Sequence, residues 1–161
     1  MEIRRAAERD YMQLAQMKWL HCQEDDIDYN EQNLVGVDKE RFIQEFIDFL
    51  KEQKEYKIFV ACEENVVASA MFVHMIPKVP KPNGNVKYIA YLTNVYTIKE
   101  YRNQQIGTKL LVYIKEYLAK EKCELIFAWP SDNSIEWYSK NGFCQENEIF
   151  ECVIREELSY G

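Results

Sequence analysis

The sequence lacks the features of several classes of protein. It contains no apolar run long enough to span a bilayer, and its first five residues do not resemble a secretory signal, so no membrane partner is expected. Its five cysteines are scattered, odd in number and without a Cys-x-x-Cys pair. A disulfide framework is therefore not expected, and a reducing cytoplasm is the natural location. Only two histidines are present, far apart, so no metal site is predicted.

Positive charge is also scarce, since the formal net charge is −7 at pH 7. This balance argues against general binding of nucleic acid. It does not exclude an anionic cofactor, because a cofactor site needs only a local positive potential. A Walker-type phosphate loop is excluded, because the chain has no Gly-x-x-x-x-Gly-Lys-Ser/Thr pattern.

What is present is typical of a globular protein. The 161 residues suit one domain over 1–161, and 47% hydrophobic with 29% charged residues is an ordinary composition. Periodicity and turn residues predict alternating strands and helices. Strands are expected at 2–5, 56–62, 66–75, 86–97, 125–129, 143–145 and 149–154. Helices are expected at 8–22, after an Asp38 N-cap, from 106 onward, and around Tyr138 after a cap at Ser131, Asp132 or Asn133.

These elements predict an α/β fold of the mixed α+β kind. The succession of strand, helix and strand between 86 and 129 requires a crossover, and hence one central parallel pair. The apolar run 125–129 is typical of a buried parallel strand. The remaining strands are expected to be antiparallel, in a twisted sheet with helices on both faces.

The stretch from Asn94 to Leu111 organises the chain. It reads as a strand end, a polar turn at 102–108, and an amphipathic helix. A helix N-terminus offers unpaired N–H groups and partial positive charge, so this turn is a candidate phosphate site.

Two motifs carry a resemblance to a known family. The stretch 101–108 is similar to the acyl-CoA pyrophosphate loop of the GNAT superfamily of N-acetyltransferases, whose pattern is Arg or Gln, two residues, Gly, one residue, then Gly or Ala. The stretch 133–143 resembles that family's short helix with a Tyr before a terminal Gly-Phe. Two positions differ from the family pattern. Gln105 occupies the position of the motif's first Gly, and Ser131 occupies a position where many members have Asn.

The resemblance covers essentially the whole chain and implies the GNAT fold, acetyl-CoA as cofactor, and direct acetyl transfer to a primary amine. In that fold the strands ending at Thr97 and Trp129 part, and the pantetheine arm enters between them. The cofactor-binding residues that the resemblance implies are Val95, Tyr96, Thr97, Arg102, Asn103, Gln104, Gln105, Ile106, Gly107, Thr108, Ser131, Asn133 and Tyr138.

Tyr138 resembles the family's general acid, which protonates the departing CoA thiolate; the alternative is an amphipathic Tyr of the core. No Asp or Glu lies between Tyr88 and Thr97 to act as a base. Tyr91, or a water held by Thr93, are the remaining candidates, and both can equally be packing residues. His21 and His74 are further candidate bases, although isolated histidines are more often structural.

The acceptor is expected to be a small-molecule or peptide amine that the sequence does not name. The acidic residues 24–28 fall in a predicted loop, 21–33, where this family builds part of the acceptor pocket. They favour a cationic acceptor, unless the loop is only solvated. Aromatic content and an exposed last strand suggest a homodimer. The alternatives to an enzyme are a non-catalytic acyl-CoA-binding or regulatory module, and a plain interaction domain.

Overall fold

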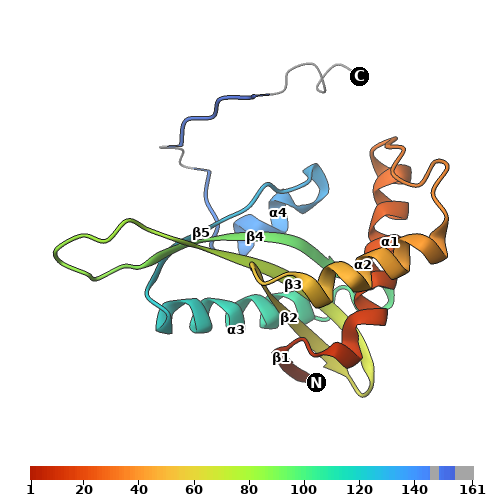
Figure 1. Ribbon diagram of the computed structural model, residues 1–161, viewed down its shortest axis with the longest axis horizontal. Coiled ribbons are helices and arrows are strands. Elements are labelled where there is room, and N and C mark those ends of the chain that lie inside the picture. Colours follow the sequence, from red (N-terminus) through yellow and green to blue (C-terminus); the bar gives the residue numbers. More distant parts are fainter. Residues whose placement is uncertain (146–148, 155–161) are drawn as a thin grey trace. The chain divides into compact units, whose positions relative to one another are not determined.

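The computed structural model describes residues 1–145 and 149–154 (Figure 1). The chain divides into two compact units, 1–129 and 130–161, which we describe separately as unit 1 and unit 2. The expectation of a single domain over 1–161 stays a prediction.

Unit 1 is built on a five-stranded sheet. Its strands lie in the order of the sequence: β1 (Glu2–Arg5), β2 (Tyr56–Glu63), β3 (Val66–Pro77), β4 (Tyr88–Thr97) and β5 (Cys123–Phe127). The first three pairings are antiparallel, and β4 pairs with β5 in parallel. The predicted mixed sheet with one parallel pair is thereby confirmed.

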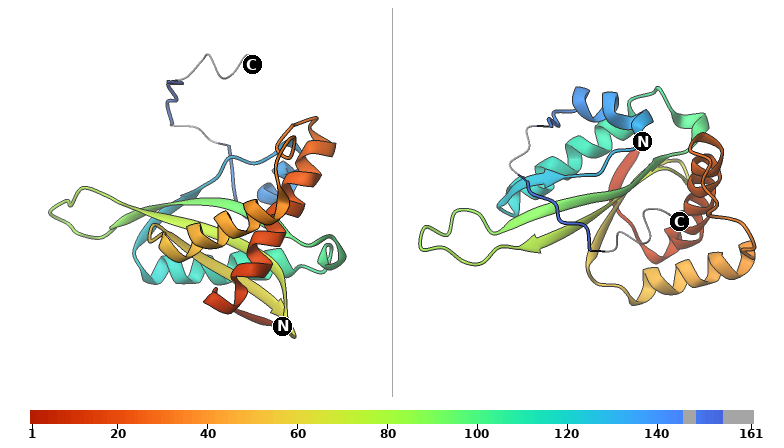
Figure 2. Two further views of the ribbon diagram at one scale, coloured as in Figure 1. Left: turned by 45° about the vertical axis from the view of Figure 1, so that its right-hand side comes forward. Right: turned by 90° about the horizontal axis from the view of Figure 1, so that it is seen from above.

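Helices cover both faces of this sheet. They are α1 (Tyr11–Asp28), preceded by the 3-10 turn η1 (Glu8–Asp10), then α2 (Lys39–Glu52) and α3 (Ile106–Lys120), the last preceded by the 3-10 turn η2 (Lys99–Tyr101). Ile58 clusters with Leu14 of α1 and Leu50 of α2, whereas the ring of the next residue, Phe59, meets Tyr117 of α3 at 5.2 Å. Because successive strand residues point to opposite faces, α3 lies on one side and α1 and α2 on the other (Figure 2).

The predicted N-cap of α2 is confirmed, since the Asp38 side chain accepts a hydrogen bond from the Arg41 backbone N–H at 2.9 Å. The predicted loop 21–33 is wrong over its first half, because α1 continues to Asp28. The Asp26 carboxylate accepts hydrogen bonds from the backbone N–H groups of Asn33 and Leu34, which ties the following turn to the end of the helix. Residues 23–28 are polar apart from Ile27 and show no helical apolar period, so the sequence pattern did not indicate the helix.

Two predictions about the later strands are also wrong. The apolar run was expected to form a central buried strand at 125–129, but β5 is an edge strand of the unit 1 sheet and Leu125 is 45% exposed. Residues 143–145 and 149–154 form no strand in the described part of the chain. The side chains of Phe150 and Ile154 are exposed, because no neighbouring strand pairs with this segment there. The predicted turn at 146–147 lies outside the described residues.

Unit 2 contains the 3-10 turn η3 (Asp132–Ser134) and the short helix α4 (Ile135–Lys140). The predicted cap was slightly misplaced: Ser131 precedes η3, and Ser134 is the residue that precedes α4. The predicted left-handed glycine after this helix is confirmed, since Gly142 has φ 89°. The Phe143 N–H donates to the Tyr138 carbonyl at 3.1 Å and the two rings lie 5.1 Å apart, as in a Schellman motif.

Candidate functional site

Strands β4 and β5 part at one point, which we call the fork. Their last paired residues are Tyr91 and Phe127, and β4 continues to Thr97. Beyond the fork β4 contains a bulge, because its register against β3 shifts and Asn94 has a left-handed φ of 51°. On the side of β5, no strand pairs with 92–97 within the described residues. Backbone hydrogen-bonding groups on that side of β4 are therefore available to a ligand.

The turn before α3 has the geometry of an anion site. Residues 102–105 are exposed, whereas Ile106 is buried and anchors the start of the helix. The first bond of the helix runs from the Lys109 N–H to the Gln105 carbonyl at 3.0 Å. The N–H groups of Ile106, Gly107 and Thr108 precede that bond and lie at the positive end of the helix dipole. A phosphate bound there would meet both the donors and the dipole.

The structure explains why the family motif has glycine at position 105. Gln105 has φ 61°, in the left-handed region that glycine enters without steric cost. Asn103 also has φ 61°. Gln105 therefore adopts the left-handed conformation in place of the family's glycine. The turn keeps its shape, but its backbone is strained at this residue.

Replacing Gln105 by glycine is accordingly expected to stabilise the protein, by about 1 kcal/mol. Affinity for acetyl-CoA is expected to hold or rise. The free energy of unfolding of Gln105→Gly, measured by denaturant titration, checks this. Gln104→Gly is the matched control, since φ is not positive at Gln104, and it should lose stability. Equal effects of the two substitutions would contradict the strain at Gln105.

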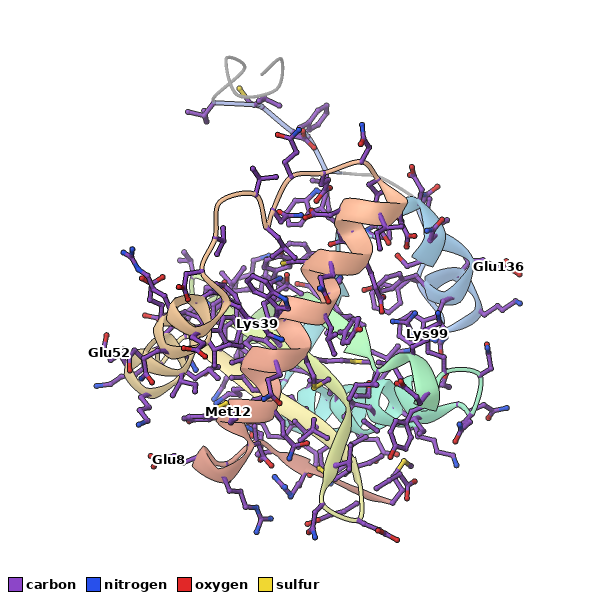
Figure 3. The ribbon with its side chains drawn as sticks, turned by 90° about the vertical axis from the view of Figure 1, so that its right-hand side faces the viewer. Glu8, Met12, Lys39, Glu52, Lys99 and Glu136 are labelled. Atoms are coloured by element: carbon purple, nitrogen blue, oxygen red, sulfur yellow. The ribbon has the colours of Figure 1, made fainter. Side chains whose placement is uncertain are left out.

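Arg102, predicted to face the phosphate, is already paired in this structure. Its Nη2 lies 2.7 Å from Glu24 Oε2, its Nε donates to the Thr97 carbonyl at 2.9 Å, and its guanidinium lies over the Tyr96 ring at 5.4 Å. Glu24 comes from α1, so one carboxylate joins that helix to the end of β4 and to the turn. Figure 3 shows α1, where Met12 is labelled, and the 3-10 turn η2, where Lys99 is labelled. The phosphate role of Arg102 stays a prediction, and it requires the guanidinium to leave or share Glu24.

The predicted contact of Tyr96 with the cofactor stays a prediction, and its side chain is already engaged in this structure. Its ring is buried and its hydroxyl donates to Glu24 Oε1 at 2.8 Å. Burial, together with this hydrogen bond, raises the pKa of the Tyr96 phenol. Thr97 is likewise engaged, with its Oγ1 2.9 Å from Ser69 Oγ. The side chains of both residues therefore hold the strand end in place.

The sequence reasoning missed the residues of α1 that reach this strand end. Besides Glu24, Lys18 donates from its Nζ to Asn94 Oδ1 at 2.8 Å and so ties α1 to the bulge. One signal was available: Lys18 is the cation within the apolar stripe of α1, and a lysine there needs a polar group for its ammonium.

His21 lies in the same region and stacks on the Tyr96 ring, with centroids 4.9 Å apart. Its Nε2 is 3.7 Å from Asp25 Oδ2, and its buried Nδ1 has no hydrogen-bond partner among the described residues. Burial lowers the pKa of His21, and the nearby Lys18 ammonium lowers it further. The imidazole is therefore neutral at pH 7.

This lowered pKa predicts a pH dependence of stability. Below the ordinary value of 6.5 the unfolded chain binds a proton at His21 that the folded chain rejects, so stability falls as the pH falls. The charged groups that act on His21 are Lys18, Glu24, Asp25 and Arg102. His21→Gln should flatten the fall between pH 7.5 and 5.5, as measured by denaturant titration. His74→Gln, which leaves His21 in place, should not; equal slopes in the two variants would contradict the assignment.

The two predicted base candidates lie at the fork, on the face that carries α1 and α2. Thr93 pairs with Phe72 of the core cluster, and Tyr91 pairs with His74. The Tyr91 ring is stacked on Phe127. Packing thus accounts for both side chains, and a role in proton transfer stays a prediction.

The acidic residues 24–28 lie on α1 instead of a loop, and two of them are engaged internally. Glu24 pairs with Arg102, and Asp26 accepts from the turn after α1, which lowers its pKa even though desolvation opposes the shift. Burial raises the pKa of Asp25. An attraction for cationic acceptors therefore depends on Asp25 and Asp28.

The remaining predicted site residues belong to unit 2. The Tyr138 ring is buried and meets Trp137 at 5.0 Å, edge to face. The Ser131 hydroxyl donates to Ser134 Oγ at 3.0 Å. The predicted contacts of Tyr138, Ser131 and Asn133 with a cofactor stay predictions.

The described residues contain neither a membrane-spanning helix nor a cluster of metal-binding side chains. No helix there combines the length and apolar character needed to cross a membrane. Nor does that part of the chain gather three or more His, Cys, Asp or Glu side chains into a group fit for a metal ion.

A protein-family model matches most of this sequence. The model of the acetyltransferase (GNAT) family matches residues 14–143, which include the turn before α3, the fork and Tyr138. No curated protein matches the sequence.

Solved structures match over nearly the full length. A predicted acetyltransferase from Clostridium acetobutylicum, solved with acetyl-CoA, has 21% identity and a TM-score of 0.70, covering 96% of this chain and 97% of its own. An aminoglycoside acetyltransferase from an uncultured soil metagenomic sample, in complex with sisomicin, has 19% identity and a TM-score of 0.66, covering 94% and 93%. Glucosamine-6-phosphate N-acetyltransferase from Arabidopsis thaliana has 15% identity and a TM-score of 0.61, covering 95% and 97%. At these identities the likeness shows the fold.

Proposed function

Because the chain belongs to the acetyltransferase (GNAT) family and is an acyltransferase that uses acetyl-CoA, we propose that it transfers the acetyl group directly to a primary amine. The observation that carries the proposal is the exposed turn before α3, with its N–H groups beside the fork. An amine acceptor is supported by two of the similar structures, which act on an aminoglycoside and on glucosamine 6-phosphate. The acceptor of this chain is a small-molecule or peptide amine.

The residues of unit 1 would hold the acyl donor in two places. The N–H groups of Ile106, Gly107 and Thr108 would bind its pyrophosphate, and the free side of β4 beyond Tyr91 would bind the pantetheine arm. A backbone N–H near the bulge at Asn94 would stabilise the oxyanion, because a fixed dipole needs no reorganisation during the reaction.

The reaction forms a C–N bond as the C–S bond breaks, and it moves two protons. An acceptor ammonium must first lose a proton to solvent; we assign this step to a water held by Thr93, or to Tyr91 acting as a relay whose hydroxyl passes one proton to water as it takes up another. The leaving thiolate must gain a proton, and we assign that step to Tyr138, because a phenol ordinarily carries its proton at neutral pH. The assignment of Tyr138 rests on the resemblance of residues 133–143 to the family motif.

Titration calorimetry of the full chain with acetyl-CoA tests the proposal, followed by a screen of amines for release of free thiol. We expect one acetyl-CoA per chain, and thiol release that depends on an amine. Acetyl-CoA that does not bind would overturn the site. Binding without transfer to any amine would favour a regulatory module.

The acidic end of α1 predicts a preference for cationic acceptors. Carboxylates near the acceptor raise the local concentration of a cation, and the effect weakens in salt. The double variant Asp25→Asn/Asp28→Asn should lower kcat/KM for a diamine severalfold in low salt, and less in high salt. Glu116→Gln/Glu121→Gln makes the same change in net charge at the C-terminal end of α3 and its C-cap, and should have little effect. If both double variants behave alike, the acidic end of α1 does not attract the acceptor.

A further inference from the structure

Three aromatic side chains meet at the fork: Tyr91, Phe127 and Trp129, which we call the aromatic cluster. The rings of Tyr91 and Phe127 are stacked, with centroids 5.3 Å apart and planes 12° apart. The Trp129 indole stands almost perpendicular to both, at 5.2 Å from Tyr91 and 5.5 Å from Phe127. The cluster is therefore held by three mutual ring contacts.

The described residues of unit 1 leave much of the aromatic surface of this cluster uncovered. Trp129 is 69% exposed, and Tyr91 and Phe127 are half-buried. Tryptophan is highly buried on average, and an exposed one loses most of the free energy that burial of its large ring provides. Its orientation is nevertheless fixed by the two stacked rings beneath it. The Trp129 indole is exposed and already held in one orientation. A ligand that binds it therefore costs little side-chain conformational entropy.

The position of the cluster relates it to the acceptor. Tyr91 and Phe127 are the last paired residues before the fork, and Tyr91 shares the α1 and α2 face with Thr93. The bulge at Asn94 is three residues further along β4, roughly 10 Å in an extended strand. A group bound on the cluster thus lies a short linker away from the part of β4 that would hold the reacting atoms.

We propose that the aromatic cluster binds the non-reacting part of the acceptor, and that this part is an aromatic ring. The inference rests on the proposed function and names the substrate class for that site: primary amines joined by a short flexible linker to an aryl group. An aryl ring meets the exposed indole by stacking or edge to face, and its π-electrons add to the apolar burial that any hydrocarbon would give. A saturated ring of the same size gains only the burial.

Binding to the full chain in the presence of CoA tests the proposal by titration calorimetry. The probes are phenylalkylamines with two to four methylenes, and cyclohexylalkylamines with the same linkers. The two series share the ammonium and the linker length and differ in the aromatic electrons. We expect the phenyl series to bind roughly three- to tenfold more tightly at the best linker length. Equal or tighter binding of the cyclohexyl series would overturn the proposal, as would equal binding of hexylamine, which offers only a cation and a chain.

Three variants locate the effect. Trp129→Leu should abolish the preference for phenyl, and Trp129→Phe should restore most of it. Tyr113→Leu removes a partly exposed ring on α3, at the opposite face of the sheet, and should leave the preference intact. A preference that survives Trp129→Leu would overturn the assignment. These are binding measurements, so absence of acetyl transfer to every amine would refute the proposed function without changing their outcome.

Discussion

The substitution Gly107→Asp is expected to lower the affinity for acetyl-CoA by roughly a hundredfold. Gly107 is the second residue of α3, and its N–H precedes the first bond of that helix. A carboxylate there would lie close to the proposed phosphate site. Two like charges about 5 Å apart repel by about 3 kcal/mol at an effective dielectric constant of 20, which corresponds to the expected change.

The same substitution should not destabilise the fold. An acidic side chain in the first turn of a helix interacts favourably with the helix dipole, so a loss of affinity would not result from unfolding. Gly107→Asn is the matched control, because it adds a side chain of the same size without the charge. Titration calorimetry with acetyl-CoA and thermal melts of both variants separate a loss of affinity from a loss of stability. If the Asp and Asn variants bind acetyl-CoA equally well, the phosphates do not lie at this turn.

Tyr138→Phe should lower turnover roughly 10²- to 10⁴-fold, the range typical of general acid catalysis. The substitution removes the proton donor and keeps the ring that packs against Phe143 and Trp137. The Schellman motif uses the Tyr138 backbone carbonyl, so the end of α4 should be unchanged. Affinity for acetyl-CoA should change little, because the lost interaction matters mainly in the transition state.

A purely structural Tyr138 predicts a different result: a loss of about 0.5–1.5 kcal/mol from a missing hydrogen bond, with near-normal turnover. Melting temperature and turnover on one sample separate the two cases. The decline of wild-type turnover at alkaline pH should also shift in the Tyr138→Phe variant. Tyr117→Phe, on α3, serves as the control for removal of a phenol hydroxyl elsewhere. A destabilised but fully active Tyr138→Phe would return this residue to a packing role.

The sequence predicted those features whose signals are local. Strands β1 to β4 and helix α3 follow from periodicity, the start of α2 from Asp38, and the left-handed end of α4 from Gly142. The mixed sheet and its parallel pair follow from the order of those elements. The candidate phosphate site at 102–108 was predicted from the helix start and from the resemblance, and the fork from the resemblance alone; the structure adds the left-handed conformation of Gln105.

Features that depend on distant residues could not be predicted. Glu24 and Arg102 are 78 positions apart, and only the packed fold brings them together. The aromatic cluster likewise needs the register that pairs Tyr91 with Phe127. The last segment shows the converse: residues 149–154 have the composition of a strand, but a strand also needs a neighbour with which to pair.

The central claim is that this chain moves an acetyl group from acetyl-CoA to an amine. The most direct measurement is one turnover with ¹³C-acetyl-CoA at a stoichiometric amount, with and without a mixture of primary amines, followed by mass spectrometry of all products. We expect the label to appear on an amine, and free thiol to appear at the same rate and only when an amine is present. Label that remains on CoA, or thiol released equally fast without any amine, would contradict it.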